Sequence, residues 1–254
     1  MSQHSFPKLS WLLLAMCISC LPALAAQEAK PHWSYSGSTS PSHWGGLGSA
    51  YAACSTGHAQ SPINIQDARK SDLPALKMNY ASVPLNIVDN GHTVQINYPG
   101  GSTLTVGDRT YTLKQFHFHH PAEEEIHGKK YDLVAHLVHA DADGYLAVVA
   151  VLFKKGTGNS LFDTLWKNVP REKEKPVDVQ SVSVNAKDLL PADTGYYTFA
   201  GSLTAPPCSE GVTWYVLKTS TTISAGQLAA FGKLYPYNAR PIQPANGREI
   251  LESK

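Results

Sequence analysis

Apolar residues of this chain recur mainly with the two-residue period of β-strands. The runs are rich in β-branched and aromatic residues and are separated by Gly, Pro and Asn, which is typical of strands joined by turns. Leu146–Phe153 is apolar without a break, which indicates a strand buried on both faces. The pattern predicts strands over Thr93–Tyr98, Ser102–Val106, Thr110–Phe118, Tyr131–His139, Tyr145–Phe153, Tyr197–Leu203 and Val212–Lys218.

Helices are few in this pattern. Ser160 stands where it would cap a helix over Leu161–Val169. Ser224 and Gln227 form a capping-box pattern that opens a short helix ending at Leu234. Because no repeat or low-complexity linker divides the chain, the sequence predicts one mostly-β domain with a large central sheet and a few short peripheral helices.

Residues 1–26 have the composition of an export signal. Lys8 supplies a positive charge, Trp11–Leu24 is apolar, and Ala23–Ala25 fits a small-residue cleavage site. The apolar run is too short for a typical transmembrane helix, and no second one follows. We therefore predict a signal peptide over residues 1–26 and a mature domain over residues 27–254, periplasmic or secreted and free of the membrane. Lipidation at Cys20 is the alternative.

The charge of the chain is almost balanced. Lys and Arg number 21 and Asp and Glu number 20, so the formal net charge is +1, and loss of Lys8 with the signal would bring it to zero. The mature region has no block of like charges. This composition argues against a nucleic acid or a membrane surface as partner.

Two cysteines, Cys54 and Cys208, remain after the predicted signal. In an exported protein an isolated pair favours a disulfide, worth roughly 5 kcal/mol for a loop of this length in the chain-entropy model. The alternative is two free thiols, one of them a metal ligand.

Histidines on two neighbouring predicted strands form the candidate chemistry. His117 and His119 share one strand face at a spacing of roughly 6–7 Å, and His136 on the next strand can meet them. Three imidazoles with one open position are typical of a catalytic zinc site. One alternative is that they are ordinary polar residues of a half-exposed strand. Another is the cupin pattern His-x-His-x-x-x-Glu, in which Glu123 would be a ligand.

Further motifs accompany the histidines in a fixed order, and together they closely resemble an α-class carbonic anhydrase of the exported bacterial type with one disulfide. The resemblance runs from His32-Trp33 to about Arg248. The motifs are Gln60–Ile65, Asn90–His92, Gln115–His119, His136–His139, Leu203–Trp214 and Asn238–Pro244.

This resemblance implies a twisted, mostly antiparallel sheet with zinc in a central cleft. The implied reaction is reversible hydration of carbon dioxide to bicarbonate and a proton, through attack by zinc-bound hydroxide. Carbon dioxide and bicarbonate would be the only partners, and the chain would be a monomer or homodimer. The implied zinc ligands are His117, His119 and His136.

The resemblance also implies roles around the metal. Thr204 would orient the hydroxide and donate its proton to Glu123, and His92 would shuttle protons to the buffer. Gln115 would support His117, and Tyr35 would help to order water in the cleft. The wall that holds carbon dioxide would be Val138, Val148, Leu203, Val212 and Trp214, and Cys54 and Cys208 match the bacterial disulfide.

Some of these residues also have a plain interpretation. Glu123 could be one of three surface acids with Glu124 and Glu125, and His92 could be an exposed residue after a hairpin turn. We interpret the remaining strand-region histidines as structural or surface residues: His120, His127 and His139.

The chain departs from the family pattern at two positions. Ala205 replaces a threonine that many members carry after Thr204, which widens the cleft. Val134 replaces a glutamate two residues before the third ligand, so His136 needs a backbone carbonyl, a water or another side chain as acceptor. On this basis Val134→Glu is expected to hold zinc more tightly. Neither departure removes a ligand, so an enzyme is favoured over a non-catalytic relative or a cupin-like metalloenzyme.

Overall fold

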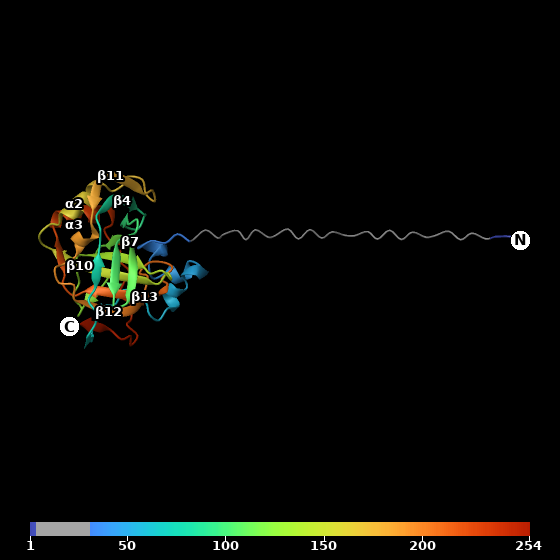
Figure 1. The fold of residues 1–254 in the computed structure, drawn as a ribbon, viewed down its shortest axis with the longest axis horizontal. Coiled ribbons are helices and arrows are strands. Elements are labelled where there is room, and N and C mark those ends of the chain that lie inside the picture. The colour runs from blue at the N-terminus through green and yellow to red at the C-terminus, as the bar shows by residue number, and fades with distance from the viewer. Residues whose placement is uncertain (4–30) are drawn as a thin grey trace. The chain divides into compact units, whose positions relative to one another are not determined.

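The predicted strands are present, each within two residues of its predicted ends (Figure 1). The structure is a computed structural model and describes residues 1–3 and 31–254. The predicted signal peptide falls mainly on residues 4–30, outside the described residues, and stays a prediction together with the alternative at Cys20. Pro31–Lys254 forms one compact unit.

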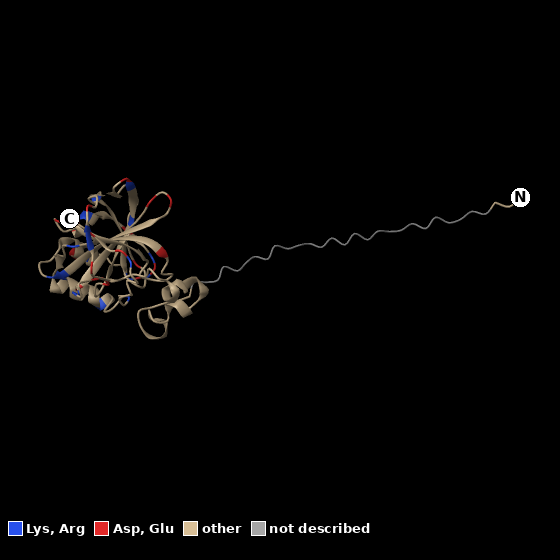
Figure 2. Ribbon diagram, turned by 90° about the horizontal axis from the view of Figure 1, so that it is seen from below, with Lys and Arg blue, Asp and Glu red and all other residues tan. Residues whose placement is uncertain are grey.

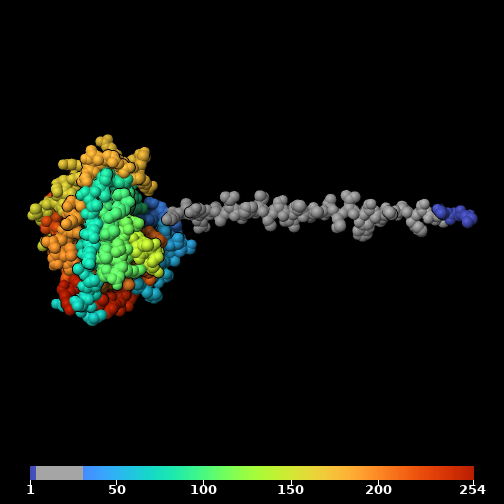
Figure 3. Space-filling view, viewed as in Figure 1, coloured from blue at the N-terminus to red at the C-terminus, as the bar shows by residue number. Residues whose placement is uncertain are grey.

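One mixed sheet organises this unit, and most of its strand pairs are antiparallel, as the resemblance implies. The strands are β1 Asn64–Ile65, β2 Arg69–Ser71, β3 Lys77–Asn79, β4 Val83–Asp89, β5 Val94–Asn97, β6 Thr103–Val106, β7 Arg109–His119, β8 Glu125–Ile126, β9 Leu133–Ala140, β10 Leu146–Lys155, β11 Val177–Val184, β12 Tyr196–Ser202, β13 Glu210–Leu217, β14 Thr221–Ile223 and β15 Leu251–Ser253. The order of the strands in the sheet is β11-β4-β5-β7-β9-β10-β13-β12-β15-β2, with β3, β6 and β14 attached at the side and a separate pair β1-β8. Figure 3 shows β5 (teal) and β7 (green) side by side on one face.

Two of the longer strands were not predicted, and both lie at one edge of the sheet. β4 contains Pro84, which argues against a strand when the sequence is read alone. β11 is mostly exposed and carries little apolar signal. The predicted two-sided burial of Leu146–Phe153 is confirmed, because β10 lies between β9 and β13 and is buried along most of its length.

Three α-helices are described: α1 Ala53–Thr56, α2 Ser160–Lys167 and α3 Ala225–Leu234. The capping box of Ser224 and Gln227 is confirmed. The predicted cap of α2 was wrong: Asn159 accepts the hydrogen bond from the Leu161 N–H, and Ser160 is already helical. An amide side chain one residue earlier satisfies the same free donor.

The two faces of the sheet have different surroundings. One face packs Leu133, Ala135 and Leu137 of β9 into the larger core, which α2 and α3 complete through Phe162 and Phe231. Alternate residues of β9 point to the other face, where a smaller apolar cluster and the candidate site lie. Figure 2 shows Lys and Arg interspersed with Asp and Glu along the ribbon. No helix among the described residues is long and apolar enough to span a membrane.

Candidate metal centre

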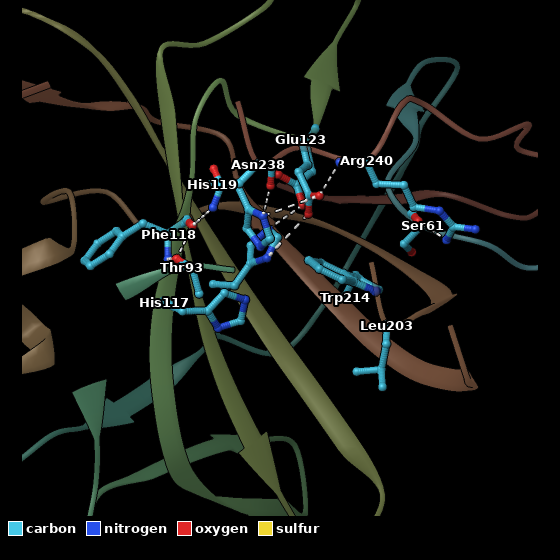
Figure 4. A network of polar contacts seen from close by, with 12 residues as sticks. Ser61, Thr93, His117, Phe118, His119, Glu123, Leu203, Trp214, Asn238 and Arg240 are labelled. Atoms are coloured by element: carbon cyan, nitrogen blue, oxygen red, sulfur yellow. Dashed lines mark hydrogen bonds and ion pairs between the residues drawn. The ribbon is translucent and has the colours of Figure 1, made fainter. Parts of the chain in front are cut away.

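Antiparallel pairing of β7 and β9 brings the three predicted ligands together. His117 lies directly opposite His136, and His119 lies opposite Val134. One ring nitrogen from each histidine lies within 4.8 Å of the others. Figure 4 shows His117 and His119 projecting from one strand toward the same region, as expected for alternate residues of a strand.

The outward ring nitrogens of these histidines each donate a hydrogen bond. His117 Nδ1 donates to Gln115 Oε1 at 2.8 Å, and His119 Nδ1 donates to the Asn238 carbonyl at 2.7 Å. His136 Nε2 donates to Glu124 Oε1 at 2.8 Å. Each ring is therefore fixed in one orientation, with its other nitrogen directed at the common point.

The inward nitrogens are free to bind a metal. His119 Nε2 is buried and has no hydrogen-bond partner among the described residues. A buried nitrogen without a partner is costly, and a metal ion would satisfy it. Three imidazoles with one open position are the donor set of a catalytic zinc site, so the residues present fit that ion.

Burial keeps two of the imidazoles neutral. It lowers the pKa of His117 to about 3, with a smaller contribution from His136, and it lowers the pKa of His119 well below its usual value. For His136 burial also lowers the pKa, but the charges of Glu124 and Glu123 outweigh it, so the pKa is raised. The neutral imidazole is the form that binds a metal.

Glu124 was missed by the sequence interpretation, which treated it as one of three surface acids. It is only 1% exposed, and it is the side-chain acceptor that the sequence left open for His136. β8 follows it and pairs with β1, where the Glu125 N–H donates to the Ile63 carbonyl. Because that contact joins segments far apart in the chain, no local pattern could have revealed it.

The same finding corrects the expectation for Val134. Val134 is fully buried in the smaller apolar cluster, and the outward nitrogen of His136 already has a carboxylate acceptor. A second carboxylate would have no free donor on that ring. Val134→Glu is therefore no longer expected to tighten zinc binding, and an unpaired buried charge would destabilise the fold.

Glu123 is also buried and lies behind the histidines. Its Oε1 accepts the Arg240 backbone N–H at 2.7 Å (Figure 4). Burial raises the pKa of Glu123 to about 8, while His136, the Arg240 N–H and the Thr204 hydroxyl lower it. Glu123 Oε1 lies 3.5 Å from His119 Nδ1 and Oε2 lies 3.9 Å from His136 Nδ1. Glu123 is not part of the group of ligand atoms that lie within 4.8 Å of one another, so the geometry does not favour the cupin-type role of a ligand.

A cavity of about 140 Å³ opens beside the histidines. Of the residues predicted for the carbon dioxide wall, four line it together with Thr204, namely Val138, Val148, Leu203 and Trp214. The structure places Val212 outside this lining, buried in the adjacent apolar cluster. Ala205 and Pro206 complete the rim, so the position without a second threonine faces the cavity.

His92 and Tyr35 lie with the aromatic residues near the start of the described domain. The His92 ring stacks on Trp33 with a centroid distance of 3.6 Å, and its Nε2 lies 3.0 Å from the Trp33 carbonyl. Tyr35 packs against Trp33 and Trp44, and burial followed by the charge of Glu123 raises its pKa. Neither residue lines the cavity.

Cys54 and Cys208 form the predicted disulfide. The Cys208 N–H donates to the Ala205 carbonyl, so the bridge ties the first helix to the loop that carries Thr204. His139 is buried against Tyr80, His120 donates to the Asp132 carbonyl, and His127 is an exposed turn residue. These three histidines are structural or surface residues, as the sequence indicated.

Three converging histidines beside an apolar cavity, all held by one large sheet, make this chain a candidate metalloenzyme. The family model described as eukaryotic-type carbonic anhydrase matches residues 39–254. A carbonic anhydrase of Neisseria gonorrhoeae is 44% identical over 251 residues, which are 98% of this chain and 98% of that protein.

Solved structures agree. A hyperthermostable carbonic anhydrase from a hydrothermal vent chimney matches with a TM-score of 0.85 and 45% identity, covering 88% of this chain and all of the other. The α-carbonic anhydrase of Thermovibrio ammonificans, in complex with the inhibitor sulfanilamide, matches with a TM-score of 0.84 and 40% identity, covering 89% and 100%. The chain belongs to the α-carbonic anhydrase family and is an enzyme of that family, whose general reaction is hydration of carbon dioxide.

Proposed function

We propose that this chain catalyses the reversible hydration of carbon dioxide to bicarbonate and a proton, with Zn²⁺ held by His117, His119 and His136. The observation that carries the proposal is the convergence of three ring nitrogens whose opposite nitrogens are all hydrogen-bonded. Zinc at such a site supplies a nucleophile at neutral pH by lowering the pKa of its water to about 7, a value known for this family.

Thr204 and Glu123 orient the nucleophile. Glu123 holds the Arg240 N–H with one oxygen, and its other oxygen has no hydrogen-bond partner among the described residues within normal geometry. Thr204 lies near enough to lower the pKa of Glu123, so its hydroxyl can turn to donate to this free oxygen. A hydroxyl that donates to a carboxylate can only accept from a second partner, so Thr204 would fix the direction of the attacking lone pair.

The apolar wall binds the substrate. Carbon dioxide has no net dipole, and a surface of Val138, Val148, Leu203 and Trp214 would hold it beside the metal without hydrogen bonds. Ala205 leaves this end of the cavity without a second hydroxyl for bicarbonate.

His92 moves the proton to the buffer. It is half-buried, stacked on Trp33, and lies on the turn between β4 and β5. Imidazole is the side chain best suited to accept and release protons around neutral pH, which is what a shuttle to the buffer requires.

We further propose that residues 1–26 are removed on export and that the mature enzyme works in the periplasm or outside the cell. The disulfide supports this location, because such bonds persist in oxidising compartments. Amino-terminal sequencing of the mature protein should begin near Ala26 or Gln27. A chain that retains Met1 and stays in the cytoplasm would contradict the proposal.

Zinc content and carbon dioxide hydration, measured on the same preparations, test the function. The parent should hold about one zinc ion per chain, lose activity on chelation and regain it with zinc. His119→Ala should lose both metal and activity, whereas His127→Asn, at an exposed turn with φ of 51°, should keep both. Sulfanilamide should inhibit the parent. A His119→Ala protein with full zinc and full activity would overturn the assignment.

A further inference from the structure

The turn that carries His92 is closed by its own side chains. Asn90 Oδ1 accepts the N–H groups of His92 and Thr93 at 3.0 and 2.9 Å, and Asp89 Oδ1 accepts the Gly91 N–H at 3.0 Å. Gly91 has φ of +85°, a conformation that favours glycine. These contacts set the shape of the turn, but they do not fix its place relative to the metal centre.

Two side chains from the segment after α3 reach this turn from outside. The Tyr235 hydroxyl donates to Asp89 Oδ1, and both residues are buried. Asn238 Nδ2 donates to the His92 carbonyl at 3.0 Å and to the Phe118 carbonyl of β7 at 2.9 Å. The turn is therefore held at two of its residues by one short stretch of chain.

Asn238 also holds the strand of the metal ligands. Its backbone carbonyl accepts from His119 Nδ1 at 2.7 Å, and its side-chain oxygen accepts the His120 N–H at 2.7 Å. Figure 4 shows Asn238 beside His119 and Phe118, with its contacts to these two residues drawn as dashed lines. One residue without solvent exposure thus connects the His92 carbonyl to a predicted zinc ligand.

We propose that Tyr235 and Asn238 are positioning residues for proton export, which hold the His92 turn at a fixed place relative to His119. The proposal rests on the proposed function, because it needs His92 to carry protons. Geometry matters in such a step, since a misplacement of about 1 Å can cost roughly 100-fold in rate. The Thr93 hydroxyl also donates to the Phe118 carbonyl at 2.6 Å, so the turn stays attached to β7 when either tie is lost. The expected change is therefore a small displacement of His92 while the zinc ligands stay in place.

The Tyr235 hydroxyl can be removed with little other change. The ring belongs to the larger core and packs near Phe231, with 5.8 Å between ring centroids. Tyr235→Phe keeps that packing and removes only the donor to Asp89. Tyr237→Phe is the matched control, because Tyr237 is 52% exposed and its hydroxyl makes no hydrogen bond to any described residue.

The experiment compares four zinc-loaded proteins: the parent, Tyr235→Phe, Tyr237→Phe and His92→Ala. Carbon dioxide hydration is measured at a low (weak) and a high (strong) concentration of imidazole buffer, and the zinc content of each preparation is measured as well. In weak buffer Tyr235→Phe should lower kcat roughly 3- to 10-fold. Strong buffer should restore kcat, while kcat/KM and zinc content stay at the parent values. Hydrogen exchange of the Gly91 and His92 amides should become about tenfold faster.

A second variant tests the other tie. Asn238→Asp replaces the donor to the His92 and Phe118 carbonyls by an acceptor, while the backbone contact with His119 remains. If it folds, it should show the same buffer-dependent loss as Tyr235→Phe. If it does not fold, Tyr235→Phe decides the proposal alone.

The possible results separate the two proposals. If His92→Ala is slow in weak buffer but Tyr235→Phe matches the parent in rate and amide exchange, the positioning role is overturned and the function stands. A loss in Tyr235→Phe that strong buffer does not restore, or that comes with loss of zinc, also overturns it, because a general structural defect behaves in that way. If His92→Ala equals the parent in weak buffer, His92 is not the shuttle and both the proton step and this inference fail.

Discussion

The outward nitrogens of His117 and His136 meet acceptors of two different kinds. Gln115 lies two residues before His117 on the same strand face, is half-buried and lines the cavity. Glu124 lies outside β9, is fully buried, and reaches His136 because β8 pairs with the distant β1. The acceptor for the outward nitrogen is thus a neighbour in sequence for His117 and a residue brought close by the tertiary fold for His136.

This difference shows which parts of the site the sequence could predict. Side chains at i and i+2 share a strand face, so the convergence of His117 and His119 follows from local geometry, whereas the role of Gln115 came from the family resemblance. The acceptor for His136 depends on where a loop of three acids packs, and three adjacent glutamates look alike in sequence. Their burial separates them: Glu123 and Glu124 are inside, and Glu125 is only partly buried.

Reduction of the disulfide is expected to have the largest effect and concerns a distant contact that the sequence did predict. Cys54 and Cys208 are 154 residues apart, and loss of that crosslink should lower the free energy of unfolding by roughly 5 kcal/mol in the chain-entropy model. Urea unfolding with and without reductant measures it, and the protein that stays folded should keep its zinc.

Thiol titration of the unfolded, unreduced protein is the control and should find no free thiol from Cys54 or Cys208. Release of zinc from reduced but folded protein would contradict the account, because it would make a cysteine part of the metal site. The pair was predictable because two isolated cysteines in an exported protein favour a disulfide, and because the family resemblance implied the same pair.

His139 offers the next largest effect and contrasts with His136 on the same strand. Its Nδ1 donates to the Ala147 carbonyl, so its Nε2 accepts from the Tyr80 hydroxyl and neither nitrogen is free for a metal. Burial lowers the pKa of His139 to about 4, below the roughly 6.5 of an unfolded chain. The unfolded state therefore binds more protons between these pH values, and stability falls as the pH drops through that window, by about 3 kcal/mol in total.

Urea unfolding at pH 7 and at pH 4 checks this prediction. His139→Gln should lose about 2–3 kcal/mol less on acidification than the parent, since the replaced residue no longer titrates. The ligand histidines are the same in both proteins, so their titration cancels in the comparison. An equal acid loss in both proteins would show that His139 is not the titrating group.

The fold was more predictable than the shell around the ligands, and for a physical reason. The burial pattern of a strand is repeated over many residues, so the apolar pattern of β7, β9 and β10 is long enough to predict each strand. β4 and β11 were missed because Pro84 interrupts the first and the second is largely exposed. The cap of α2 was misplaced by one residue because Asn159 and Ser160 are both good capping residues.

Zinc affinity of a matched pair of variants tests the central claim most directly, namely that buried Glu124 fixes the third ligand. Glu124→Leu and Gln115→Leu each replace an acceptor by an apolar side chain of similar size. Glu124→Leu should weaken zinc binding about 10- to 100-fold, because it leaves the His136 N–H buried without an acceptor. Gln115→Leu should weaken it about tenfold or less, because water in the cavity can replace the amide. Competition titration of both proteins, with urea unfolding of their zinc-free forms to separate affinity from stability, gives the answer. Equal zinc affinity for Glu124→Leu and the parent would contradict the account.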